Sequence, residues 1–87
     1  MFRMWLKLVK GGKMIDEMTY EHAGETNRTA KIFAGIEAAC GKWNLAQPIW
    51  YDANIKEFKK RAGCRFLQEN FVENVDFDFM EIKVIEE

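Results

Sequence analysis

The first twenty residues alternate between apolar and polar side chains, with the period of two that is typical of a β-strand. The apolar positions of the first run are Phe2, Met4, Leu6 and Leu8. Gly11-Gly12 follows, and two glycines supply the positive φ angles of a tight turn. We therefore predict a β-hairpin over residues 2–22. A two-residue turn predicts three opposed pairs: Leu8 with Ile15, Trp5 with Met18, and Lys7 with Asp16.

This register places large apolar side chains on both faces of the hairpin. The face turned away from the helices would carry Trp5, Val9, Met14, Met18 and Tyr20. Two short helices cover only one face of a small sheet, and an exposed apolar patch generally marks an interface. We expect this face to be a protein interface, with a partner or a second copy, unless residues 44–52 and 66–76 wrap over it.

Two later segments have helical spacing. Thr26 can cap a first helix that ends at Asn44, and we expect Gly35 to allow a close approach to the sheet. The apolar stripe of this helix is Phe33, Ile36, Cys40 and Trp43. A capping box of Asn54 and Glu57 predicts the start of a second helix, which runs to about Ala62 and stops at Gly63. Its buried stripe is Ile55, Phe58 and Ala62.

The remaining residues complete the sheet. Residues 45–52 hold the single proline and form an extended connection or a short strand. Residues 64–67 predict a short strand, and the alternation around Met80, Ile82 and Val84 predicts a final one. Residues 68–75 stay open between a helical turn and irregular chain. We predict an α+β fold with a single domain over residues 1–87. One antiparallel sheet, made of the N-terminal hairpin and C-terminal strands, packs against two main helices.

The charges of the chain balance overall but not locally. The formal net charge of the 87 residues is -1. Residues 1–65 contain every Lys and Arg except Lys83, whereas residues 66–87 contain half of the acids. We expect the acidic end to neutralise the basic part within one fold, the alternative being a basic surface that meets a partner. The balance does not demand a nucleic acid or an anionic membrane.

Several chemistries and locations are disfavoured. No apolar stretch approaches the roughly 20 residues of a membrane span, and Arg3 and Lys7 interrupt any signal sequence. The chain has no serine, and its one histidine, His22, is not clustered with Cys40 or Cys64. We therefore expect a cytoplasmic protein with reduced thiols that is not an enzyme and has no metal, no cofactor and no membrane partner.

The basic second helix is the strongest candidate for an anion or nucleic-acid surface. Its cations are Lys56, Lys59, Lys60 and Arg61, with Arg65 just after. Trp50, Tyr51 and Phe66 flank them, and rings can stack on bases while cations follow phosphates. The simpler interpretation is a solvated helix face beside Ile55 and Phe58.

Seven short segments carry a resemblance to a known group of proteins. They are Thr29-Ala30-Lys31, Ala39-Cys40, Pro48-Ile49-Trp50, Lys56-Glu57-Phe58-Lys59, Arg65-Phe66, Asp76-Phe77-Asp78 and Ile82-Lys83-Val84-Ile85-Glu86. Over about residues 2–86 the chain resembles small, uncharacterised single-domain bacterial proteins of gut Firmicutes, and the resemblance implies no catalytic or binding residue. The leading prediction is a small non-enzymatic protein-interaction or adaptor module that can self-associate. The alternative is a nucleic-acid-binding module that uses the second helix.

Overall fold

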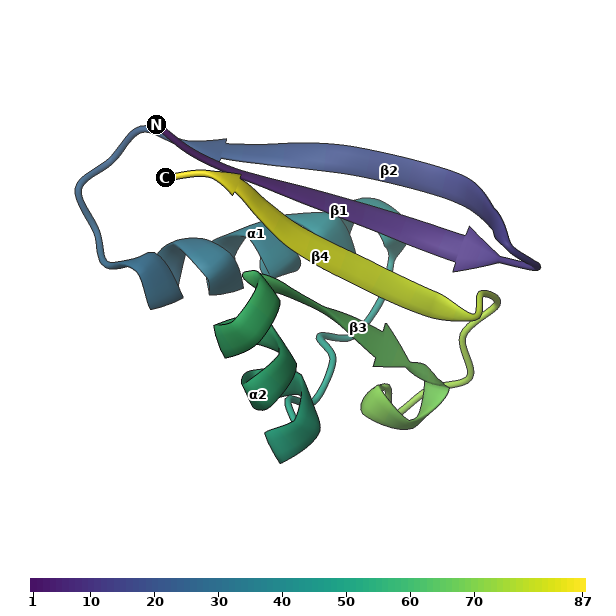
Figure 1. The fold of residues 1–87 in the computed structure, drawn as a ribbon. Coiled ribbons are helices and arrows are strands. Elements are labelled where there is room, and N and C mark those ends of the chain that lie inside the picture. The colour runs from purple at the N-terminus through teal and green to yellow at the C-terminus, as the bar shows by residue number, and fades with distance from the viewer.

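A computed structural model describes residues 1–87 and contains one sheet and two helices. The elements are β1 (Phe2–Lys10), β2 (Lys13–His22), α1 (Arg28–Trp43), α2 (Asp52–Arg61), β3 (Gly63–Leu67), a 3-10 turn (Gln68–Asn70) and β4 (Phe79–Glu86). The four strands form one antiparallel sheet in the order β2-β1-β4-β3 (Figure 1). The predicted α+β fold is confirmed.

The core lies between one face of the sheet and the two helices. The first-strand residues Phe2, Met4, Leu6 and Leu8 are all buried there. α1 packs on β1 and β2, whereas α2 packs on β3, so the helices cover neighbouring parts of the same face (Figure 1). They contribute to the core Ile32, Ile36, Ala39 and Cys40 of α1 and Phe58 of α2.

The hairpin turns where its glycines predict, but its register differs from the predicted one. Gly11 and Gly12 have φ angles of 60° and 77°. A β-bulge follows on β2: Val9 pairs with Met14, but Leu8 pairs with Asp16, so Ile15 is the additional residue. The predicted pairs are therefore wrong: Trp5 lies opposite Thr19, Lys7 opposite Glu17 and Leu8 opposite Asp16.

This shift divides the predicted hairpin interface between the two faces of the sheet. Side chains alternate with a period of two, so a shift of one residue moves each following side chain to the opposite face. Met18 and Tyr20 consequently pack against the core. Trp5, Val9 and Met14 remain on the face that is turned away from the helices, which we call the open face.

The helix boundaries differ from the predicted ones by a few residues. Asn27, rather than Thr26, caps α1, because its side-chain oxygen accepts a hydrogen bond from the N–H of Ala30 at 2.8 Å. Tyr51 precedes α2, so Asn54 lies inside the first turn instead of capping it. Asn44, the predicted end, caps the C-terminus of α1, and Ala62 caps that of α2; both of these residues adopt positive φ.

The two connecting segments whose conformation the sequence left open contain little regular structure. Residues 45–51 form an extended connection with no strand, and residues 68–75 contain only the 3-10 turn. Both segments pack on the helix side of the sheet, through Leu45, Trp50, Phe71 and Val75. They therefore do not wrap over the open face.

The buried stripes of the helices are shifted relative to the predicted ones. In α1 the buried residues include Ile32 and Ile36, whereas Phe33 keeps 43% of its surface exposed. In α2 the buried residues are Asn54 and Phe58, and Ile55 is 41% exposed. Phe33 and Ile55 thus lie at the margins of their stripes, on the sides of the helices that border the space between them.

Candidate functional site

Trp50 occupies the space between the two helices. Its indole meets three rings edge-on, with centroid distances of 5.9 Å to Phe33, 5.8 Å to Phe58 and 5.0 Å to Phe66. Phe66 is fully buried and Trp50 only partly buried. Edge-to-face aromatic pairs contribute about 0.5–1.5 kcal/mol each beyond the burial of area. Trp50 is therefore held firmly on its inner side while its outer side reaches the surface.

Two buried asparagines fix the backbone on both sides of Trp50. Asn70 donates from its side chain to the Ile49 carbonyl at 2.7 Å, and the Asn54 side-chain oxygen accepts from the Tyr51 N–H at 3.0 Å. The two asparagines are joined to each other by a hydrogen bond of 2.8 Å. No buried side-chain polar atom lacks a partner. This network fixes the backbone that carries the Trp50 indole.

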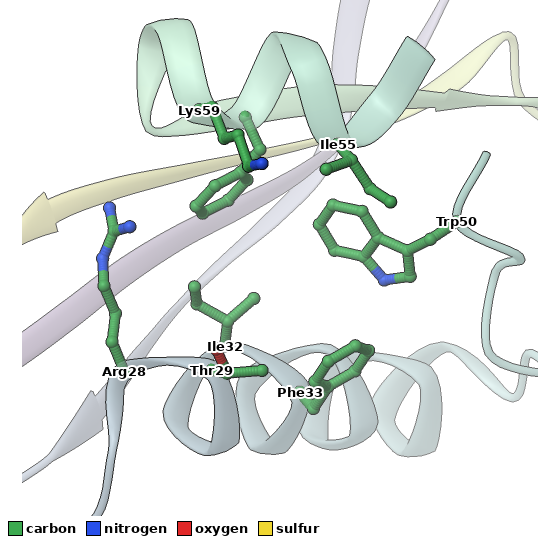
Figure 2. Close-up of a pocket in the computed structure, with 8 residues that line it drawn as sticks. Arg28, Thr29, Ile32, Phe33, Trp50, Ile55 and Lys59 are labelled. Carbon is green, nitrogen blue, oxygen red and sulfur yellow. The ribbon is translucent and has the colours of Figure 1, made fainter. Parts of the chain in front are cut away.

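A groove of about 350 Å³ opens between α1 and α2 (Figure 2). Its lining is mostly apolar and consists of Arg28, Thr29, Ile32, Phe33, Trp50, Ile55, Phe58 and Lys59. Phe33 and Ile55 form its two walls and are exposed to water, although burying such side chains is favourable. Exposed apolar surface gathered at one concave place is typical of a binding site.

The rim of the groove is positively charged. Figure 2 shows Arg28 at one end and Trp50 at the other, with Lys59 projecting from α2. The Arg28 guanidinium lies 5.4 Å from the centroid of the Phe58 ring, and its Nε is 2.7 Å from a carboxylate oxygen of Glu87. Lys59 forms no ion pair, and no acidic side chain lines the groove.

The five cations that the sequence groups have different surroundings. Lys59 lines the groove, whereas Arg61 and Arg65 line a different depression together with Glu57 and Glu81. The remaining two, Lys56 and Lys60, are exposed on α2.

Arg65 is also engaged in the sheet. Its Nε is 3.4 Å from Glu81, and its guanidinium lies 4.6 Å from the centroid of the Phe79 ring. The buried ring of Phe66 is not accessible for stacking on a base. A nucleic-acid surface over the five cations stays a prediction, without stacking on Phe66.

The open face carries charged pairs around Trp5. The indole Nε1 of Trp5 donates to Glu17 at 2.8 Å, and the ammonium of Lys7 lies 4.6 Å from the indole centroid. Lys7 is also 3.7 Å from Glu81, and Arg3 Nε is 2.7 Å from Glu21. Trp5 is therefore partly covered by its own charged neighbours instead of forming an apolar patch.

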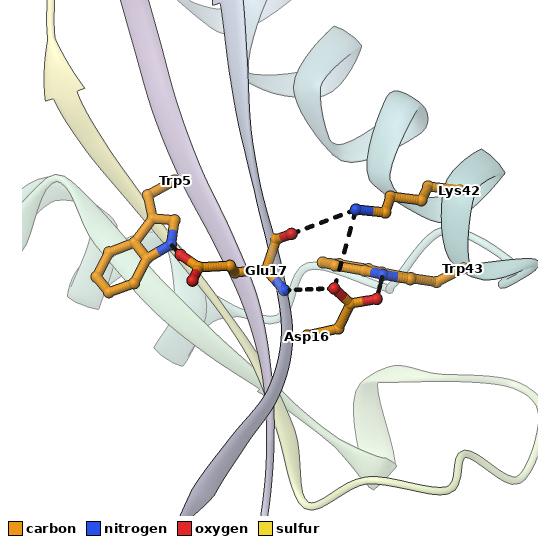
Figure 3. A network of polar contacts seen from close by, with 5 residues as sticks. All are labelled: Trp5, Asp16, Glu17, Lys42 and Trp43. Atoms are coloured by element: carbon orange, nitrogen blue, oxygen red, sulfur yellow. Dashed lines mark hydrogen bonds and ion pairs between the residues drawn. The ribbon is translucent and has the colours of Figure 1, made fainter.

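A second polar network ties the end of α1 to the bulge in β2 (Figure 3). The indole N–H of Trp43 donates to Asp16 at 2.8 Å, and Lys42 donates to the Glu17 carbonyl at 3.3 Å. The hydrogen bond from Trp43, together with one from the Glu17 N–H, lowers the pKa of Asp16 below its usual value. Trp43 is only partly buried. It packs against the core and also donates a hydrogen bond at the surface.

The residues considered for catalysis or metal binding have separate surroundings. His22 Nδ1 lies 3.0 Å from the Tyr20 hydroxyl. Cys40 and Cys64 are free and buried, and burial raises the pKa of Cys40 to about 11 and that of Cys64 to about 12. No group of three or more His, Cys, Asp or Glu side chains could hold a metal ion. Neither helix has the length and apolar character needed to cross a membrane.

Sequence reasoning missed most of the groove. It named Trp50 and Lys59 as parts of a nucleic-acid surface and assigned Phe33 and Ile55 to the core. One available signal was the adjacent pair Ile32 and Phe33 in α1, because one helical stripe cannot bury both fully. The Asn54–Asn70 hydrogen bond had no such signal, because the two residues are sixteen positions apart in the chain.

No protein-family model matches the chain, and neither a curated protein nor a solved structure matches it. The resemblance to small bacterial proteins therefore stays a prediction. The function proposed below rests on the geometry of the groove.

Proposed function

We propose that this protein is a small interaction module that binds a segment of a partner protein in the groove between α1 and α2. The observation that carries the proposal is the exposure of Phe33 and Ile55 on either side of Trp50. Fully burying one large apolar side chain contributes about 1.5–3 kcal/mol. Because roughly two fifths of each wall residue is still exposed, a partner that covers both gains part of this free energy.

The shape of the groove favours a protein segment over a small ligand. Pockets for small molecules commonly enclose about 70–90% of the ligand surface. Here two helices form the walls, and the outer sides of Phe33, Ile55 and Lys59 remain in solvent. A chain segment can lie along such an open groove while its other side stays exposed or contacts the rest of the partner.

The size of the groove predicts a modest affinity. A stable protein–protein interface commonly uses about 20–30 residues on each side, whereas eight residues line this groove. The firm placement of Trp50 reduces the ordering cost of binding, which partly compensates for the small area. We expect a short segment to bind with a Kd on the order of micromolar, equivalent to about 8 kcal/mol.

The proposal is a binding role rather than a catalytic one. The lining residues include no carboxylate, imidazole or thiol, and both cysteines are protonated and buried at neutral pH. The predicted self-association required Met18 and Tyr20 on the same hairpin face as Trp5. Both of these side chains pack against the core instead, so the open face does not carry the predicted set of residues.

Selection from a displayed library of random peptides tests the proposal without assuming a sequence. We expect the parent protein to enrich peptides with large apolar side chains, and the Ile55→Lys variant to bind them at least about tenfold more weakly, which corresponds to about 1.4 kcal/mol. Val72→Lys is the matched control, because Val72 is 77% exposed and does not line the groove. Enriched peptides that bind the parent and Ile55→Lys equally would overturn the proposal, as would a selection that enriches none.

A further inference from the structure

We infer that the partner segment is acidic: an apolar side chain enters the groove between Phe33 and Ile55, and a carboxylate beside it is held by Arg28 and Lys59. This inference rests on the proposed function and specifies the chemistry of the partner. It comes from three features of the rim: the sign of its charges, the ion pair that already exists there, and the distance between the basic and apolar ends.

The cations at the rim have few opposing charges. Arg28 and Lys59 line the groove without any acidic neighbour in the lining. Lys56 and Lys60, on the adjacent exposed face of α2, also form no ion pair. A basic segment entering the groove would be repelled by these charges. An acidic segment is attracted during its approach and is bound in preference to a basic one.

The chain itself places a carboxylate at one end of the groove. Glu87 lies 2.7 Å from Arg28 Nε, and both side chains are about half exposed. An exposed ion pair of this kind contributes only about 0.2–1 kcal/mol. A carboxylate of the partner can therefore replace Glu87 at Arg28 with little loss, and Glu87 acts as a weak internal competitor.

The dimensions of the groove set the spacing between the two recognition elements of the partner. Arg28 and Phe33 are five positions apart in α1, which corresponds to about 7.5 Å along the helix axis. Two residues of an extended segment cover about 6.6 Å. We therefore expect the carboxylate to lie about two positions from the apolar anchor in an extended partner, or about one turn away in a helical one.

The peptide selection described above tests this inference separately from the proposed function. We expect the enriched peptides to contain Asp or Glu more often than Lys or Arg, close to a Leu, Ile, Phe, Trp or Met. If the peptides depend on Ile55 but are neutral or basic, the inference is wrong and the proposed function stands. If no enriched peptide depends on Ile55, the proposed function itself fails.

Charge variants then test the roles of the two cations with one enriched acidic peptide. We expect Lys59→Glu and Arg28→Glu each to weaken binding by about tenfold at low salt, and high salt to reduce the difference. Lys13→Glu makes the same change of net charge at the hairpin turn, where Lys13 is exposed and forms no ion pair. Equal weakening by Lys13→Glu would show a general effect of net charge and overturn the assignment of the two cations.

The competition between Glu87 and the partner carboxylate for Arg28 predicts a variant that binds more tightly instead of more weakly. Glu87→Gln removes the charge that faces Arg28, so we expect the acidic peptide to bind about two- to fivefold more tightly. The same variant should leave binding of a Gln-substituted, neutral version of that peptide unchanged. A weaker or unchanged affinity for the acidic peptide would contradict the competition and the placement of its carboxylate at Arg28.

Two other occupants appear as distinct results. If the parent protein dimerises at high concentration and Ile55→Lys abolishes the dimer, the groove binds a second copy and the acidic-segment inference is overturned. If a single-stranded oligonucleotide binds in a way that Lys59→Glu abolishes and Ile55→Lys does not, the cations serve phosphate binding instead. Sedimentation and fluorescence anisotropy measure these two outcomes directly.

Discussion

Alanine substitution at two glycines of α1 should have opposite effects on stability. Ala is favoured over Gly inside a helix by up to about 1 kcal/mol, so propensity alone would stabilise both variants. At Gly41 an added Cβ meets no atom within 4 Å. At Gly35 the added Cβ would overlap the terminal methyl of Met4 and lie 3.1 Å from the Tyr20 ring. Because Met4 is fully buried, its methyl group has little free space to move into.

The magnitude follows from comparing the two variants. Forcing an additional methyl group into a packed core costs about 1–3 kcal/mol. The gain in helix propensity is common to both substitutions, although it is smaller for Gly41 near the end of the helix. We therefore expect Gly35→Ala to lose up to about 2 kcal/mol and Gly41→Ala to gain up to about 1 kcal/mol. The difference between them measures how closely α1 approaches the sheet.

Urea unfolding followed by far-ultraviolet circular dichroism provides the measurement. The midpoint should fall for Gly35→Ala and rise slightly for Gly41→Ala, with an unchanged slope m in both. Shortening the clashing side chain in the double variant Met4→Val with Gly35→Ala should recover part of the loss, because the two sites are in contact. If Gly35→Ala is as stable as Gly41→Ala, the close approach of α1 to Met4 and Tyr20 is wrong.

Four further predictions concern the two cysteines, Asp16 and Asn70. The raised pKa values of Cys40 and Cys64, about 11 and 12, imply scarce thiolate, so iodoacetamide should modify them only after unfolding; rapid labelling of the native protein would contradict their burial. Because their folded pKa values lie above the unfolded ones, their contribution to stability is present below about pH 9 and is lost as the pH rises through those values, and Cys64→Ala should flatten that alkaline decline. Because the folded pKa of Asp16 is lowered, its contribution to stability is present above its ordinary pKa and is lost as the pH falls through the folded value. Trp43→Phe should raise the pKa of Asp16, measured by NMR titration of its carboxyl group. An unchanged titration would show that the Trp43 hydrogen bond does not cause the lowered pKa. Asn70→Leu should cost about 2–3 kcal/mol in chemical unfolding, because it leaves buried backbone groups without partners, and a loss below about 0.5 kcal/mol would argue against the asparagine network.

The elements of this fold are local properties, and the sequence predicts them well. Alternation predicts the strands β1 and β4, Gly11-Gly12 predicts the hairpin turn, and spacings of three and four predict both helices. The hairpin register was not predictable in this way. It depends on the bulge at Ile15, beside which Asp16 accepts a hydrogen bond from Trp43 at the far end of α1. A contact between residues 27 positions apart leaves no periodic trace in either segment.

The groove was missed for a related reason. Helical periodicity identifies the buried side of a helix to within about one residue, and Phe33 and Ile55 lie next to that side. Whether such marginal residues are covered depends on how far apart the two helices are. Trp50, in the connection between them, sets that separation, and its position is determined by Asn70 from a later part of the chain. A pattern within each helix cannot contain this information.

The uneven charges of the sequence are explained by the order of the strands. β4 lies between β1 and β3, so Glu81 of the acidic C-terminal part comes within 3.7 Å of Lys7 and 3.4 Å of Arg65. Arg3 is likewise close to Glu86, and Lys10 to Asp76. The expected internal neutralisation therefore occurs mainly on and around the sheet.

α2 is left out of this neutralisation. Its residues Ile55, Phe58 and Lys59 line the groove, and none of its four cations, Lys56, Lys59, Lys60 and Arg61, forms an ion pair. Placing cations near the C-terminal end of a helix is favourable by about 0.3–1 kcal/mol, which accounts for Lys59, Lys60 and Arg61 in the last turn. It does not account for the apolar groove beside Lys59, because the exposed parts of Phe33 and Ile55 contribute no burial free energy. The coincidence of unpaired cations with partly exposed apolar side chains at this groove is what an acidic, apolar partner segment would require.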